Sequence, residues 1–152
     1  MTEPVFKTIE VACDAAMAFT VFTEKIATWW PLDKNSLSAM EGKVAQSLSI
    51  EPSIGGKIIE IAHDGSPHIW GTVTRFDPGK RLTLDWVLAS SADIEPTIVD
   101  VKFIDIGNGR ARVELTHDNW QGHGDNAQNH RDNYNQGWVG VFEEAYAGAC
   151  GR

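Results

Sequence analysis

The chain has 152 residues, of which 42% are hydrophobic and 22% charged, the proportions of an ordinary globular protein. This length suits one domain, and no repeat or linker divides the sequence, so we expect a single domain over residues 1–152. The formal net charge of −8 opposes binding to nucleic acid and to anionic membranes.

The N-terminal residues carry no basic-then-apolar signal pattern, and no apolar run approaches the length that spans a membrane. We therefore expect a cytoplasmic protein. Two cysteines, Cys13 and Cys150, stand at opposite ends of the chain. A disulfide between them is geometrically possible because chain ends often lie close together, but reduced thiols are expected in the cytoplasm.

Hydrophobicity alternates over residues 5–11, which predicts a first strand. Asp14 suits the N-cap of a following helix. That helix has one apolar face and ends at Pro31. The face consists of Phe19, Phe22, Ile26 and Trp30. Residues 32–43 are polar and irregular and indicate a mobile connection.

A period of two returns from Val44 to Trp120 and predicts six strands. We place them near residues 44–51, 57–62, 68–77, 80–88, 96–106 and 110–119. Short segments rich in Gly, Pro, Asn and Asp separate most of them, which is typical of an antiparallel meander. Residues 89–95 form a longer connection.

A helical period follows a polar loop over residues 121–125. Asp125 and Gln128 have the spacing of a capping box, and we expect the helix to run to about Ala149, where Gly148 and Gly151 end it. One stripe of this helix combines rings and aliphatic side chains. It consists of His130, Tyr134, Trp138, Val141, Phe142 and Ala145.

This order of elements predicts an α+β protein in which a curved antiparallel β-sheet wraps around a long C-terminal α-helix. A sheet with one apolar face must cover that face, and the last helix has the largest apolar stripe available. The same order, together with short sequence words at matching spacing, resembles the START-like (SRPBCC) superfamily. Within it the chain is similar to the family named after the activator of heat-shock protein 90 ATPase. The words include Ile26–Pro31, Gly55–Lys57, Trp70–Val73, Leu84–Trp86, Arg112–His117 and Gly137–Trp138.

The resemblance implies a helix-grip fold with an elongated cavity between sheet and helix. The strand pattern by itself places large apolar side chains on one face, and two glycines in the helix, Gly137 and Gly140, would leave room beside the rings. Aromatic stripes also form filled cores, which is the alternative. We expect a mostly apolar pocket with a few polar groups, in which His117 and His130 orient a polar end of the ligand. Its predicted ligand-binding residues are Trp70, Trp86, His117, His130, Tyr134 and Trp138.

Three histidines, His117, His123 and His130, alternate with aspartates, but their spacing matches no metal motif, so we expect no metal and no cofactor. Acid–base chemistry by His117 or His130 with Glu60 or Asp85 is conceivable, but no catalytic residue is assigned. The leading hypothesis is a non-catalytic or weakly catalytic protein that binds a small hydrophobic molecule. The alternatives are an enzyme acting on a small carbonyl or aromatic substrate, and a chaperone-interacting stress-response module. The richness in tryptophan also makes a homodimer possible.

Overall fold

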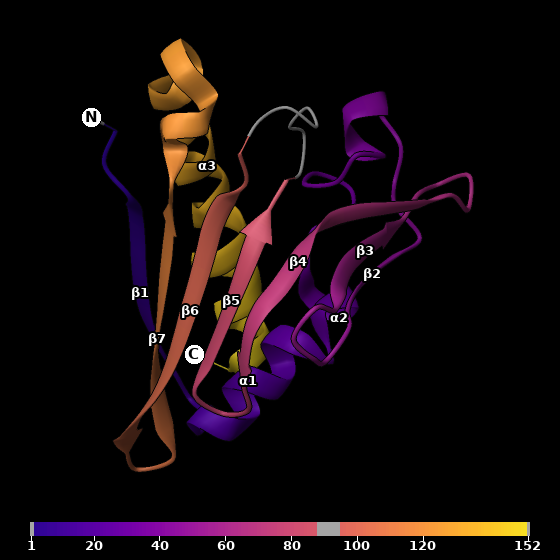
Figure 1. The fold of residues 1–152 in the computed structure, drawn as a ribbon. Coiled ribbons are helices and arrows are strands. Elements are labelled where there is room, and N and C mark those ends of the chain that lie inside the picture. The colour runs from indigo at the N-terminus through magenta and orange to yellow at the C-terminus, as the bar shows by residue number, and fades with distance from the viewer. Residues whose placement is uncertain (1, 88–94, 152) are drawn as a thin grey trace.

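The structure is a computed structural model that describes residues 2–87 and 95–151. A first strand and two short helices precede six strands, and the chain ends in a long helix (Figure 1). The strands are β1 Val5–Val11, β2 Ser47–Ile50, β3 Lys57–Ile61, β4 Pro67–Asp77, β5 Arg81–Trp86, β6 Thr97–Gly107 and β7 Arg110–Asp118. The helical segments are α1 Ala15–Thr23, α2 Ile26–Trp29, η1 Ala39–Glu41, η2 Trp120–Asn126, α3 Ala127–Trp138, η3 Val139–Tyr146 and α4 Ala147–Cys150.

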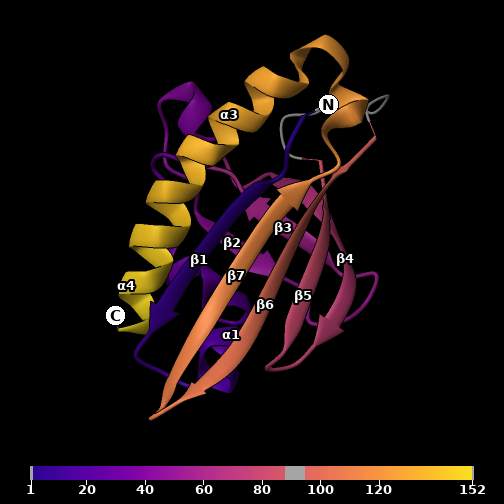
Figure 2. The same ribbon diagram turned by 90° about the vertical axis from the view of Figure 1, so that its left-hand side faces the viewer.

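The seven strands form one antiparallel sheet in the order β1-β7-β6-β5-β4-β3-β2. Strands β2 to β7 are a meander, and β1 joins it beside β7, where Val5 is opposite His117. The sheet curves, and α3 with its continuation lies along one face, while α1 and α2 close the lower end (Figures 1 and 2). The predicted fold, a curved antiparallel sheet around the last helix, is therefore confirmed.

The predicted strands agree with the structure to within about three residues at their ends. The inner face of the sheet carries the apolar side chains that alternation placed there, including Leu84, Val101 and Val113, all essentially inaccessible to solvent. Leu88 and residues 89–94 of the predicted longer connection lie outside the described residues.

The first helix differs from its prediction because it breaks at Glu24 and Lys25 instead of running to Trp30. Asp14 caps α1 as expected, since its side chain accepts a hydrogen bond from the Met17 amide at 2.9 Å. The break re-aims the chain, and both tryptophans at the end of α2 turn into the core. Trp29 donates its indole N–H back to the carbonyl of Val21 at 2.7 Å.

The C-terminal helix also departs from a regular α-helix. Its first α-helical turn begins at Ala127 after Asn126, and the cap makes no side-chain hydrogen bond, so the predicted Asp125–Gln128 capping box is wrong. The expected polar loop before it is a short 3₁₀ segment, η2. Residues 139–146 are wound as a π-helix, and Gly151 ends α4 with a positive φ of 75°.

The two cysteines are free thiols, and Cys150 is buried at the end of α4. The Cys13 and Cys150 side chains interact, which ties the start of α1 to the end of the chain. Burial raises the pKa of the Cys150 thiol to about 12. Among the described residues, none of the helices is both long and apolar enough to cross a membrane.

Candidate functional site

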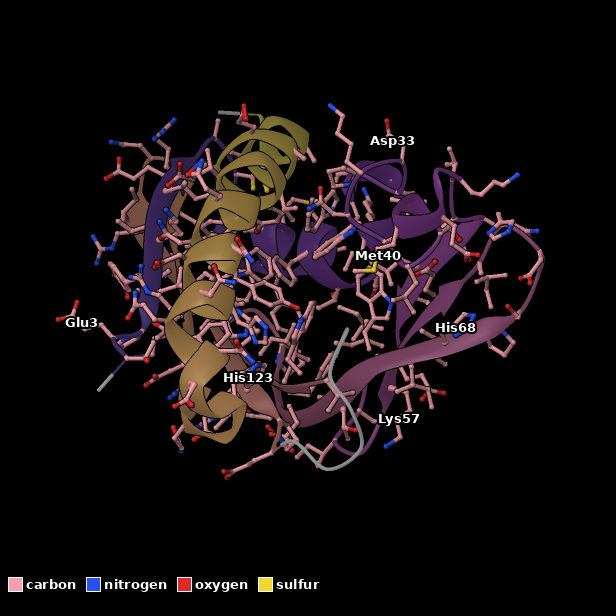
Figure 3. All side chains as sticks on the ribbon, turned by 90° about the horizontal axis from the view of Figure 1, so that it is seen from above. Glu3, Asp33, Met40, Lys57, His68 and His123 are labelled. Carbon is pink, nitrogen blue, oxygen red and sulfur yellow. The ribbon has the colours of Figure 1, made fainter. Side chains whose placement is uncertain are left out.

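A cavity of about 330 Å³ lies between α3, the inner face of the sheet and the connection between α2 and β2. Its volume falls in the range of small-molecule sites. Figure 3 shows that two of its walls come from distant parts of the chain, with His123 on the helix side and Met40 on the connection. The lining residues are Trp30, Lys34, Asn35, Ser36, Met40, Trp86, His123, His130, Asn133, Tyr134, Gly137, Trp138 and Val141.

Three tryptophans form the apolar floor of the cavity: Trp30 at the end of α2, Trp86 on β5 and Trp138 on α3. The Trp30 ring lies 5.9 Å from the Trp138 ring and 6.3 Å from the Trp86 ring, and Trp86 and Trp138 are 5.9 Å apart between ring centroids. Trp70 packs behind them, 5.3 Å from Trp30. Such offset and tilted contacts are favourable for aromatic rings and keep the floor rigid.

Each tryptophan indole N–H in the chain has a hydrogen-bond acceptor, so burial of the rings leaves no donor unpaired. In the cavity floor, Trp30 donates to the Asn35 carbonyl at 2.6 Å, and Trp86 donates to the Tyr134 hydroxyl at 3.0 Å. Burial raises the pKa of Tyr134 above its usual value. The Tyr134 hydroxyl is therefore a neutral polar group at the cavity wall.

Behind this wall, His117 on β7 is completely buried and holds three elements together. Trp138 donates its indole N–H to His117 Nδ1 at 3.1 Å, which leaves the proton of the neutral ring on Nε2. Nε2 lies 2.7 Å from Thr97 Oγ1 and so donates to this hydroxyl. Burial lowers the pKa of His117 to about 3, and the nearby His123 contributes to the shift.

The connection that forms the outer wall is fastened to the sheet by Glu60. The carboxylate of this fully buried residue accepts hydrogen bonds from the amides of Leu37 and Ser38, from the Ser38 hydroxyl and from the Trp70 indole, at 2.8 to 3.1 Å. A buried carboxylate must be paired or fully hydrogen-bonded, and four donors satisfy this requirement. The connection, predicted to be mobile, is thus anchored through its middle.

Two histidines at the upper end of the cavity contact each other. His123 in η2 and His130 in α3 have their Nδ1 atoms 2.6 Å apart, with the rings nearly perpendicular. Nδ1 of one ring must donate and that of the other accept. Burial and the charge of His130 lower the pKa of His123. The Nε2 atom of His123 is buried and has no hydrogen-bond partner among the residues the structure describes.

The glycines in the last helix differ in their surroundings. Gly137 lines the cavity, and a Cβ atom there would meet the side-chain amide of Asn35 at 3.9 Å. Gly140 is not part of the cavity lining, and a Cβ there would meet no described atom within 4 Å. Only Gly137 therefore makes room for the cavity.

Four of the six predicted ligand-binding residues come together at the cavity wall: Trp86, His130, Tyr134 and Trp138. Trp70 and His117 do not line it, because both are fully buried in the layer behind. His117 has no free ring nitrogen for a ligand, since both nitrogens bind other side chains.

The sequence does not predict the wall formed by the connection, namely Lys34, Asn35, Ser36 and Met40, and it predicts only a polar loop around His123. A polar, irregular segment gives no periodic signal. The one available clue was Glu60, a carboxylate at an inward position of a strand, which needs donors from elsewhere.

The acid–base pairs considered from sequence are not formed. Glu60 is occupied by the connection, and Asp85 lies between the inward-facing Leu84 and Trp86 and so points to the opposite face of the sheet. No group of three or more His, Cys, Asp or Glu residues suited to a metal ion occurs within residues 2–87 and 95–151.

A curved sheet that grips the last helix around a cavity defines the helix-grip class of proteins. Residues 12–144 match the family described as "Activator of Hsp90 ATPase homolog 1-like protein", and the chain belongs to this family. No curated protein matches the sequence.

Several solved structures have the same fold. One, an anthrahydroquino-γ-pyrone synthase, Txn09, complexed with SUM, is 31% identical with a TM-score of 0.67 over 96% of both chains. The self-sacrificing resistance protein CalC from Micromonospora echinospora is 21% identical with a TM-score of 0.65, covering 95% of this chain and 92% of that one. The Aha1 dimer from Colwellia psychrerythraea is 14% identical with a TM-score of 0.62, covering 97% and 98%. The last two likenesses concern the fold alone.

Proposed function

We propose that the protein binds a small, largely apolar aromatic molecule in the cavity between α3 and the sheet. The observation that carries this proposal is the cavity of about 330 Å³ with a floor of three tryptophans, Trp30, Trp86 and Trp138. The lining also includes polar side chains, among them His123, His130 and Tyr134, which would orient the ligand. The 31% identity to a protein named as an anthrahydroquino-γ-pyrone synthase supports an aromatic ligand.

The size of the cavity sets the expected affinity. A ligand of three fused rings buries on the order of 200 Å² of apolar surface, worth roughly 5 kcal/mol at about 25 cal/mol per Å². That corresponds to a dissociation constant of order 0.2 mM before ordering costs and polar contacts are counted. Tighter binding requires the polar groups at the upper end.

The experiment titrates the protein with a panel of planar two- and three-ring compounds, including anthraquinone, while tryptophan fluorescence and melting temperature are recorded. We expect quenching and a thermal shift, because any ligand in the cavity contacts the indole rings of its floor. Gly137→Leu fills the cavity and should abolish both signals, whereas the matched variant Gly140→Leu should retain them. Equal binding by both variants would place the ligand elsewhere.

The same cavity supports a second function, acid–base chemistry on a bound aromatic carbonyl compound. What favours it is the likeness to the 31% identical protein, whose name is that of a synthase. The test incubates the protein with hydroxyaryl ketones able to close to a γ-pyrone and follows products by mass spectrometry. Product formation no faster than in buffer would exclude this activity for those compounds.

A chaperone-interacting module, the remaining alternative, needs an apolar surface outside the cavity. The six tryptophans do not supply this surface, because each is at most 8% exposed. For the same reason they do not form a surface for the homodimer that their number suggested. The large apolar side chains that are exposed in the described part of the chain come from three strands, from α1 and from two connections, and two of them share β6. They are Phe6, Met17, Met40, Val44, Ile54, Ile69, Ile98 and Ile106. The cavity is accordingly the feature on which the proposed function rests.

A further inference from the structure

The lining of the cavity carries a charge pattern opposite to that of the whole chain. The formal net charge is −8, yet the lining residues within the described part of the chain include Lys34, His123 and His130 and no aspartate or glutamate. Lys34 forms no ion pair with any described residue. A lysine in the cavity lining that forms no ion pair with a described residue favours a ligand that carries or develops negative charge.

The imidazole pair supplies a second, independent observation. The His123 Nε2 atom is buried without a described partner, which is costly for a polar nitrogen and indicates an atom whose partner is a ligand or water. When His123 Nδ1–H donates to His130 Nδ1 across 2.6 Å, the lone pair of His123 Nε2 is unused. In the other tautomer, His123 Nε2–H is a free donor.

We propose that the ligand is an aromatic molecule with an acidic hydroxyl group, a phenol or an enol, and that the His123–His130 pair takes up its proton. This inference rests on the proposed function and names the ligand class of the same cavity. The ligand's oxygen lies at His123 Nε2, and Lys34 lines the same cavity.

The proton moves in two coupled transfers. The ligand's O–H bond breaks, its electron pair stays on oxygen, and the proton binds to His123 Nε2. The Nδ1–H bond of His123 breaks in turn, and that proton binds to His130 Nδ1, which becomes an imidazolium. The products are a phenolate or enolate that accepts from His123 Nε2–H, and a cation on His130. The pair is neutral at the start of this relay, and at the end it carries one proton more, with His123 protonated on Nε2 and His130 on both nitrogens.

The surroundings explain why the positive charge does not stay on His123. Burial lowers the pKa of His123, so a lasting cation on that ring is disfavoured. Of the other titratable groups on the neighbouring elements, His117 lies behind His123, Asp125 belongs to η2, Arg131, Asp132 and Tyr134 belong to α3, Lys34 lines the cavity and Glu95 lies beside Gly122. His117 is neutral and fully bonded, and Tyr134 is neutral, so neither competes for the proton.

The test compares 2-hydroxyanthraquinone with 2-methoxyanthraquinone, which has nearly the same shape but no acidic proton. Binding is followed by tryptophan quenching, and the ionisation state of the bound hydroxyl by its visible absorption, which moves to longer wavelength in the phenolate. We expect the hydroxy compound to bind at least about tenfold more tightly than the ether at pH 7, with a phenolate spectrum. Lys34→Met should reduce that preference roughly threefold.

His123→Gln and His130→Gln should each abolish the phenolate spectrum while still binding the ether, and binding of the ether shows that these variants are folded. His68→Gln, on β4 far from the cavity, serves as the matched control and should behave as wild type. A neutral spectrum for the bound hydroxy compound in wild type, or a phenolate spectrum retained in both cavity variants, overturns the relay and leaves the proposed function standing. Failure of both compounds to bind overturns the proposed function itself, and the relay with it.

Discussion

Replacement of His117 by glutamine should make the stability of the protein less sensitive to acid. The buried imidazole has a pKa of about 3 in the folded protein, against about 6.5 in an unfolded chain. Between these values the unfolded state binds one more proton than the folded state, so stability falls as the pH falls. The contribution is complete above pH 6.5 and is lost progressively down to about pH 3.

The loss amounts to about 1.4 kcal/mol for each pH unit in this window, or about 2.5 kcal/mol between pH 7 and pH 4.5. His117→Gln keeps an acceptor for Trp138 and a donor for Thr97 but does not titrate. Urea unfolding of both proteins at the two pH values, monitored by tryptophan fluorescence, isolates the histidine, because the carboxylates contribute equally to both. An equal loss of stability in wild type and variant would refute the reasoning.

Three further outcomes follow from the same structure. Glu60→Gln places an amide N–H₂ group among four donors, so we expect a loss of about 3 kcal/mol in urea unfolding and faster hydrogen exchange of the two backbone amides that it binds. Unchanged exchange would mean that the carboxylate does not anchor the connection. Gly137→Ala and Gly140→Ala should each raise the unfolding free energy by up to about 1 kcal/mol, because neither Cβ meets an atom closer than 3.9 Å. A gain in stability for Gly140→Ala alone would reveal a clash between the new Cβ at position 137 and Asn35. Cys150 should resist iodoacetamide at pH 8, because a pKa of about 12 leaves roughly one thiol in 10⁴ ionised. Rapid labelling of Cys150 in the native protein, detected by mass spectrometry, would contradict its burial.

The strands and the inner face of the sheet could be predicted from sequence because their signals are local. Period-two alternation decides which side chains point inward, and turn residues such as Gly107–Gly109, all with positive φ, decide where strands end. The helical stripe was predictable only as far as Phe142. The π-helical winding of residues 139–146 then shifts the register, so that Tyr146 is fully buried and stacks on Phe142 while Ala145 is only partly buried.

The candidate site was predictable in the parts that belong to regular elements. Trp86, Tyr134 and Trp138 follow from the faces of a strand and a helix. The opposite wall depends on hydrogen bonds between Glu60 and residues of the connection that are 22 and 23 positions away in the sequence. No periodic pattern encodes such a long-range contact. His123 reaches the cavity through a turn with a non-helical Gly124, whose backbone angles of 58° and −131° suit glycine alone.

The anchoring of the connection at one carboxylate separates two tasks within a small protein. The stability of the fold comes from the sheet, the tryptophan floor and the last helix. The shape of the opposite cavity wall comes instead from side chains on either side of the Glu60 contact, such as Lys34 and Met40, and Met40 is 67% exposed. Substitutions at those exposed positions can therefore change which molecules the cavity binds with little effect on the free energy of unfolding. Proteins with this fold can therefore differ in ligand specificity through changes in one surface segment while the interior is conserved.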